Sequence, residues 1–283
     1  LDMRLAPVAF FLAMLFGFAP LAVTLTAQQF SVEEDLEYAR GLMARRMHDL
    51  AKKVLDRIID DDNSSDGEKA SANLEIANLY KDKFARGLTF DERIEASEKA
   101  DAAYREFVTN FSDHPRILLA KFDYAEFLVY LGRYRIQLYD ETLLVGGTRE
   151  KADEHRAIAH EKLKKSADLF EELIVAIPGS GKEEELADLL ELCQYYRAIL
   201  YFDIGRAEKD EANRLATFQE GINALEEYIF ENEDNLRGFR GYLYKGLCHR
   251  EFAEESHKQD VLACFEGAIY AFKNVVGNPG LGW

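Results

Sequence analysis

The segment Ser166–Pro178, SADLFEELIVAIP, decides the fold. Its small residue, Ser166, is followed four positions later by Phe170 and seven positions later by Leu173. This spacing places all three side chains on one face of a helix. The small residue lets a partner helix approach closely, and the ring one turn later fills the space beside it. Pro178 cannot continue the helix. The segment therefore predicts the second helix of a closely packed helical hairpin.

The same arrangement occurs five times, each time after a helix with a small residue of its own. The small residues of the first helices are Ala39, Ala77, Ala125, Ala198 and Gly246. The second helices carry the sets Ala51/Leu55/Ile58, Ala100/Tyr104/Phe107, Ser166/Phe170/Leu173, Ala224/Tyr228/Glu231 and Ala268/Phe272/Val275. Five hairpins in series predict an all-α protein with the architecture of a helical solenoid.

Several of these motifs resemble the tetratricopeptide repeat, a helix–turn–helix unit of about 34 residues. Ile76-Ala77-x-x-Tyr80 is similar to the core of its first helix, and Ser166–Pro178 has the spacing of its second helix. The stretch Tyr104–Pro115 looks like the second-helix ends of bacterial envelope members of this family. The resemblance covers residues 31–276. It implies a right-handed α-solenoid of about five hairpins that binds a peptide or protein partner on its concave face.

The spacing of the repeats departs from the family. The paired small residues are 12 positions apart in the first hairpin, and 23, 41, 26 and 22 apart in the later ones. The array is therefore degenerate, and we expect the third first helix to cover residues 116–134 and to end in a turn at Gly132. Gly205 similarly predicts the end of the fourth first helix. The insertion Gln137–His160 predicts either a longer hairpin loop or a partner-specific protrusion.

Both chain ends carry signals of their own. Arg4 precedes the apolar run Val8–Ala19, so residues 1–27 predict a secretory signal peptide. An uncleaved N-terminal membrane anchor is the alternative, with membrane contact only through residues 5–27. We therefore expect an exported protein, periplasmic or in the cell envelope, or one anchored in the inner membrane. Residues 277–283 predict the start of a further repeat, as in the N-terminal part of a longer protein.

The charge balance excludes one class of partner. The chain has 35 basic and 52 acidic residues, which gives a formal net charge of −17. A protein that binds nucleic acid needs a basic stripe, and the longest basic clusters here are Arg45-Arg46 and Lys164-Lys165. We therefore expect no nucleic-acid partner.

No pattern for catalysis or for a cofactor stands out. The loop Ile177–Lys182 lacks a phosphate loop's first glycine and its serine or threonine, because Ala176 and Glu183 occupy those positions. His155 and His160 are five residues apart and are expected on a solvated helix, not in a metal site. The remaining histidines have no ligand-spaced partner: His48, His114, His249 and His257. The sequence therefore predicts a chain that is not an enzyme and that holds no cofactor or metal.

The three cysteines, Cys193, Cys248 and Cys264, lie among apolar residues and are expected in the core. Cys248 and Cys264 are the one pair that neighbouring helices could bring together for oxidation.

The candidate partner-binding residues follow from the family register, in which residues beside the core stripe of each first helix line the concave face. They are Arg40, Phe122, Glu126, Tyr130, Tyr195 and Asp203. Ordinary packing or surface exposure is the competing interpretation for each residue. The function expected is a non-catalytic protein–protein interaction scaffold. A membrane-anchored arm of a membrane complex and the regulatory part of a longer protein are the alternatives.

Overall fold

The computed structural model describes residues 31–232, 236–252 and 255–277. These residues form ten α-helices and one short 3-10 helix, without a strand, which confirms the all-α prediction for this part of the chain. The elements are α2 (Val32–Ala44), α3 (His48–Asp60), α4 (Asp66–Arg86), α5 (Phe90–Asn110), α6 (Ile117–Leu144), α7 (Arg149–Ala176), η1 (Ile177–Gly179), α8 (Ala187–Ala207), α9 (Glu211–Glu231), α10 (Leu236–Arg250) and α11 (Glu255–Gly277).

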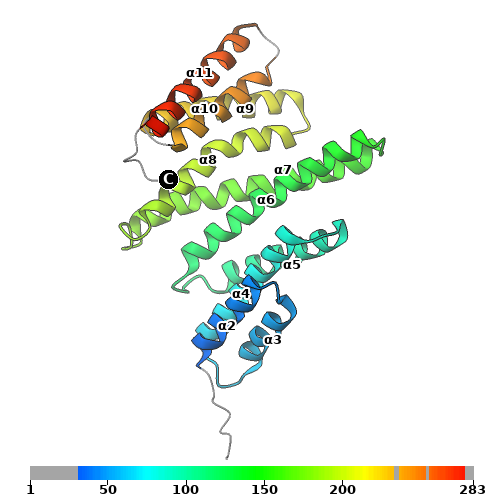
Figure 1. Cartoon of the computed structure of the whole chain (residues 1–283), viewed down its shortest axis with the longest axis vertical. Helices are drawn as coiled ribbons and strands as arrows, with labels where there is room; N and C mark the ends of the chain where they lie inside the picture. The colour runs from blue at the N-terminus through cyan, green and yellow to red at the C-terminus, as the bar shows by residue number, and fades with distance from the viewer. Residues whose placement is uncertain (1–30, 233–235, 253–254, 278–283) are drawn as a thin grey trace, which may run out of the picture.

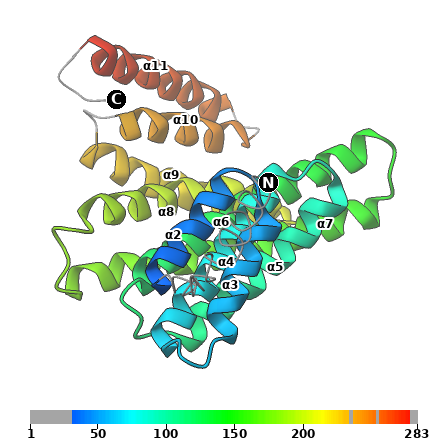
Figure 2. The same cartoon turned by 60° about the horizontal axis from the view of Figure 1, so that its bottom comes forward.

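The helices pack in the order of the sequence. Each of α2 to α10 packs against the helix that follows it, and α2 also touches α4, α6 touches α8, and α8 touches α10. Figure 1 shows the result as an elongated stack, with α2 and α3 at one end and α10 and α11 at the other. The view in Figure 2 shows the same succession from another side. Neighbours in sequence are therefore neighbours in space.

Local signals set where several helices begin. Ser31, Ser65 and Thr89 each accept a hydrogen bond from the backbone N–H three residues on, and a glutamate there accepts from the backbone N–H of the capping residue. These reciprocal bonds satisfy N–H groups that have no partner within the helix. Ser31 and Glu34 form the first of these capping boxes.

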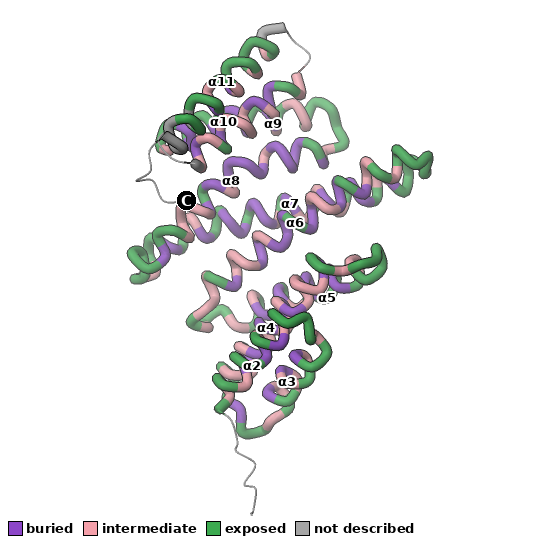
Figure 3. Tube along the Cα trace, in the orientation of Figure 1, coloured by how far each residue is buried: buried purple, intermediate pink, exposed green. Residues whose placement is uncertain are grey.

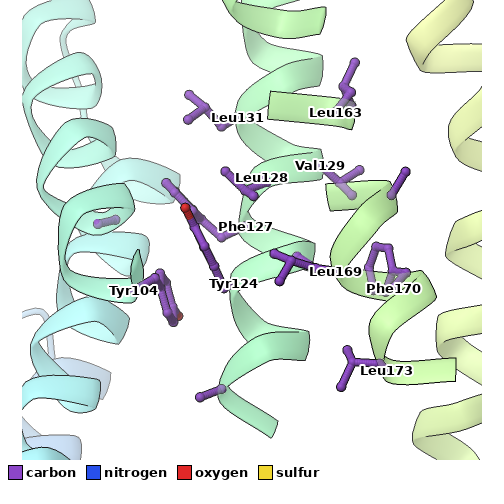
Figure 4. Close-up of a cluster of buried hydrophobic side chains, with 14 of the residues drawn as sticks. Tyr104, Tyr124, Phe127, Leu128, Val129, Leu131, Leu163, Leu169, Phe170 and Leu173 are labelled. Atoms are coloured by element: carbon purple, nitrogen blue, oxygen red, sulfur yellow. The ribbon is translucent and has the colours of Figure 1, made fainter. Parts of the chain in front are cut away.

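The core is divided into three clusters along the stack. One joins α2 and α3 to α4, a second runs from α4 to α8, and a third links α8, α9 and α10. Figure 3 shows the buried positions following the middle of the stack. In Figure 4, Tyr104 of α5 faces Tyr124 of α6, and their rings stack with centroids 5.4 Å apart. The large residues predicted from the small-x-x-x-large pattern supply this packing in the first three hairpins.

The predicted register is correct in three hairpins and wrong in parts of the other two. In the fourth, α9 turns Gly221 towards α8, where an added Cβ would lie 2.7 Å from the Cβ of Tyr201. Leu225 and Tyr228 follow it in the core, whereas Glu231 is exposed. In the fifth, Ala268 is buried, but Phe272 is 43 % exposed and rests on Phe239.

In the third and fourth hairpins the structure differs from two predicted helix ends, and in the third hairpin it also differs from the predicted long loop. Helix α6 continues through Gly132, because the side chain of Leu163 on α7 packs directly over this glycine. Helix α8 likewise continues past Gly205, on which the ring of Phe218 packs. Residues 137–160 do not form a long loop: they extend α6 and α7 to 28 residues each, joined by a short turn. The tip of this hairpin projects beyond its neighbours in Figure 1, with Leu144 and Val145 at its end.

The predicted signal or anchor, residues 1–27, lies outside the described residues, as do residues 278–283 of the predicted further repeat. Among the helices that are described, none is both long and apolar enough to cross a bilayer.

Candidate functional site

Ion pairs connect successive first helices along one side of the stack. At its start, the buried carboxylate of Glu75 on α4 lies 2.9 Å from Arg40 of α2 and 3.0 Å from Arg116, which precedes α6. Burial alone would raise the pKa of Glu75, but hydrogen bonds from Asn78 and Arg116 and the charge of Arg40 outweigh it and lower that pKa. Arg40, a predicted partner-binding residue, therefore holds α2 to α4.

The second connection joins α4 to α6. The ammonium group of Lys81 lies 2.8 Å from Glu126 and 3.7 Å from Asp123. Glu126 also accepts a 3.3 Å hydrogen bond from the hydroxyl of Tyr196 on α8. The predicted residue Glu126 thus contacts both neighbouring first helices.

The third connection joins α6 to α8 and α10. Arg133 lies 2.7 Å from the carboxylate of Asp203 and donates a 3.1 Å hydrogen bond to the hydroxyl of Tyr244. Burial raises the pKa of Asp203 above its ordinary value, and the charge of Arg133 opposes that rise. Asp203 is 5 % exposed, so this predicted partner-binding residue lies below the surface, where it binds Arg133.

A pocket of about 410 Å³ opens between α4, α5 and α6, beside the second and third ion pairs. Its lining residues are Lys81, Phe84, Ala85, Arg93, Phe127, Tyr130, Arg133, Tyr134 and Gln137. Three of these residues are cationic and none is acidic, in a chain whose acidic residues outnumber the basic ones. The pocket therefore combines aromatic walls with positive charge.

Arg93 is the cation of this pocket that remains available to bind an anion. Its Nε donates a 2.8 Å hydrogen bond to the carbonyl of Gly87, and its guanidinium lies 5.5 Å from the ring centroid of Tyr134. Within the described part of the chain, no carboxylate lies at ion-pairing distance from Arg93. Lys81 and Arg133, in contrast, already have carboxylate partners. A guanidinium held by a carbonyl and an aromatic ring keeps donors for an incoming anion.

Three predicted site residues are aromatic, and the structure places them differently. Tyr130 is 48 % exposed and lies in the pocket wall. Phe122 is half-buried against Phe170 and Tyr196, with its ring 5.9 Å and 6.2 Å from theirs. Tyr195 is 6 % exposed and packs on Tyr228, so its ring has little surface to offer a partner.

Sequence reasoning missed Lys81, Arg93 and Arg133. Arg93 belongs to a second helix, α5, whereas the family register directs attention to the first helices. Arg133 follows Gly132, which was expected to end its helix. The signal that could have found the pocket is the run of basic and aromatic residues at helical spacing on α6, from Tyr130 to Tyr134.

The predicted histidine environments need two corrections. His155 is buried instead of solvated, and its Nδ1 lies 3.3 Å from a guanidinium nitrogen of Arg135. His249 and His257, for which no partner was expected, lie together where α10 and α11 connect. The three cysteines are buried, as expected, and are free thiols, so Cys248 and Cys264, the one pair considered for oxidation, are not bonded.

Comparison of the chain with protein-family models, with curated proteins and with solved structures gave no match. The physical arrangement of the site is therefore the ground on which a function is proposed.

Proposed function

We propose that this chain is a non-catalytic interaction scaffold, built as a right-handed, tetratricopeptide-like α-solenoid. In this proposal the pocket between α4, α5 and α6 takes a carboxylate-bearing segment of a protein partner. The sequential packing of helices and the close contacts at small residues support the proposed architecture.

The observation that carries the proposal is the composition of the pocket. Arg93 has donors free for an anion, Tyr130 offers an exposed ring beside it, and no acidic residue lines the wall. An extended peptide that carries an acidic side chain or its own C-terminal carboxylate would pair with Arg93. An apolar neighbour in that peptide would pack on Tyr130, since aromatic anchors beside charges dominate many interfaces.

The ion pairs between first helices contribute rigidity to this surface. Lys81 and Arg133 belong to the pocket wall, and their carboxylate partners lie on α6 and α8. A wall fixed by such pairs loses little conformational freedom when a ligand binds.

Photo-crosslinking at single positions tests the proposal. The crosslinker p-benzoylphenylalanine replaces Tyr130 in the pocket, Tyr38 on α2, or Leu144 at the tip of the α6–α7 hairpin. Tyr38 and Leu144 are also exposed, so they report non-specific capture and capture at the tip. We expect one protein to crosslink at position 130 and not at position 38.

A second variant tests which chemical group of the pocket binds the partner. Arg93→Gln removes the free guanidinium and leaves the ion pairs of Lys81 and Arg133 in place. It should weaken capture at position 130 by about 10-fold, and added salt should weaken the unmodified protein's capture as well. If the partner crosslinks only at position 144, the pocket is not its binding site, and it binds instead at the tip of the α6–α7 hairpin.

The cell envelope of a bacterium remains the proposed location, resting on the apolar run within residues 8–19. Sequencing the N-terminus of the protein isolated from cells separates a cleaved signal from a retained anchor.

A further inference from the structure

Two histidines and an aspartate converge where α10 ends and α11 begins. The Nδ1 atoms of His249 and His257 are 2.9 Å apart, and a carboxylate oxygen of Asp260 lies 3.8 Å from the same atom of His249. One ligand atom from each of the three residues lies within 4.8 Å of the other two. We propose that these three residues bind a divalent transition-metal ion, namely Zn²⁺.

The distances suit one shared ion. Zinc binds imidazole nitrogen at about 2.0–2.1 Å in tetrahedral geometry, which separates neighbouring ligand atoms by about 3.3 Å. The separations of 2.9 Å and 3.8 Å lie on either side of that value. The Asp260 side chain is 54 % exposed, so a rotation of its carboxylate can bring an oxygen into the coordination sphere. Two imidazoles and one carboxylate leave the fourth position of a tetrahedral ion for water.

The surroundings hold the imidazoles in place. The ring of His257 stacks on Phe252, with centroids 4.2 Å apart and planes 10° from parallel. His249 is buried, with 7 % of its surface exposed. Ligands fixed by packing before the ion arrives favour binding, because less freedom is lost.

The charges near the two rings also favour a cation. Lys245 is a cation close enough to His249 to act on it. Lys245 lies 2.6 Å from Glu226, which offsets its positive charge. Asp260 contributes a negative charge 3.8 Å from Nδ1 of His249.

The competing explanation is a plain hydrogen bond, in which one ring donates from Nδ1 and the other accepts. The two explanations predict different results for Zn²⁺ binding. A hydrogen bond needs no ion, whereas a metal site must bind one equivalent of Zn²⁺ and lose it when a ligand is removed. The ion would join the last turn of α10 to the start of α11, away from the pocket of α4 to α6. The metal site is therefore independent of the proposed partner-binding pocket.

The test is Zn²⁺ binding to the full chain without an affinity tag, measured by competition with a chromophoric chelator. Co²⁺ serves as a second probe, since its visible absorption reports coordination. His257→Ala and Asp260→Asn remove ligands that are not buried in the core. His48→Ala is the matched control: His48 forms an imidazole–carboxylate pair with Asp82 at 2.6 Å but has no second imidazole.

We expect one equivalent of Zn²⁺ on the unmodified chain and on His48→Ala. His257→Ala should raise the dissociation constant by at least about 100-fold, and Asp260→Asn by about 10-fold. Added Zn²⁺ should raise the melting temperature only where the three ligands are intact. Failure of the unmodified chain to bind stoichiometric Zn²⁺, or equal binding by His257→Ala, would overturn the site and leave the hydrogen bond as the explanation.

Discussion

Arg133 of α6 lies 2.7 Å from the carboxylate of Asp203 on α8, although 70 residues separate them in the chain. Asp203 is almost fully buried, and Arg133 reaches it from the wall of the pocket. The pair therefore links the core of the stack to the surface proposed to bind a partner. Variants that break this ion pair measure how much it contributes to the stability of the fold.

Removing one partner of this pair should destabilise the protein strongly. Arg133→Met leaves the Asp203 carboxylate buried without its cation, and we expect a loss of about 3 kcal/mol in the free energy of unfolding. The double variant Arg133→Met/Asp203→Asn removes both charges and should cost less than the sum of the single changes, by about 2 kcal/mol. Urea unfolding of the four proteins measures this coupling. Additive effects would show that the two groups do not interact.

Glu75 should make stability depend on acid pH. Its pKa in the folded protein is below the ordinary value of 4.5, so the unfolded chain binds more protons as the pH falls through that range. The ion pairs of Glu75 therefore stabilise the fold above about pH 4.5, and this contribution is lost as the pH falls through the folded-state pKa.

Glu75→Gln should therefore cost about 2 kcal/mol at pH 7 and progressively less below pH 4.5. Thermal unfolding from pH 3 to pH 7 gives the difference between the two proteins. Glu106→Gln, on the exposed side of α5, provides the control and should leave the profile unchanged. A pH-independent difference would mean that Glu75 acts by packing alone.

Two helical glycines should respond to alanine in opposite directions. At Gly132 an added Cβ would lie 2.5 Å from Cγ of Leu163, so Gly132→Ala forces α6 and α7 apart and should cost about 1–3 kcal/mol. At Gly41 on α2 nothing lies within 4 Å, so Gly41→Ala should stabilise by about 0.5–1 kcal/mol. Chemical denaturation measures both, and a neutral Gly132→Ala would contradict the close helix contact.

The cysteines should react slowly with thiol reagents in the folded protein. Burial raises the pKa of Cys193 and of Cys248 to about 12, and it also raises the pKa of Cys264. Since the thiolate is the reactive form, few of these groups are ionised at pH 8. A chromogenic disulfide should label all three in guanidinium chloride and almost none in buffer. Rapid labelling of the native chain would contradict their burial.

Much of the fold could be predicted because small residues mark helix contacts. Ser166 and Ala125 were paired from the pattern, and the Ser166 hydroxyl donates a 2.8 Å hydrogen bond to the Ala125 carbonyl. The pattern was wrong where tertiary contacts override local preference. Gly132 ends a helix by propensity, but Leu163 occupies the space that its missing side chain leaves. Local sequence does not contain that information.

The site was predictable only in part, for a similar reason. Tyr130 and Tyr195 look alike in sequence, each on the same helix as the pattern's small residue. Their exposure differs because Tyr228 of the partner helix α9 packs on Tyr195, whereas the pocket leaves Tyr130 open. Arg93 was missed because its place in the pocket depends on how α5 approaches α6. Such contacts between helices follow from the assembled structure.

The order in which the helices pack also bears on how the chain folds. Most contacts join helices that are adjacent in sequence and close short loops, although Arg133 also reaches Asp203 and Tyr244, 70 and 111 residues away. Chains with such local contacts fold quickly. Within the described helices, α2 with α3 and α10 with α11 pack against a neighbouring hairpin on one side only, so unfolding can proceed inward from these two hairpins. Amide hydrogens of α2 and of α11 should exchange with solvent sooner than those of α6 and α7, where the largest core cluster lies.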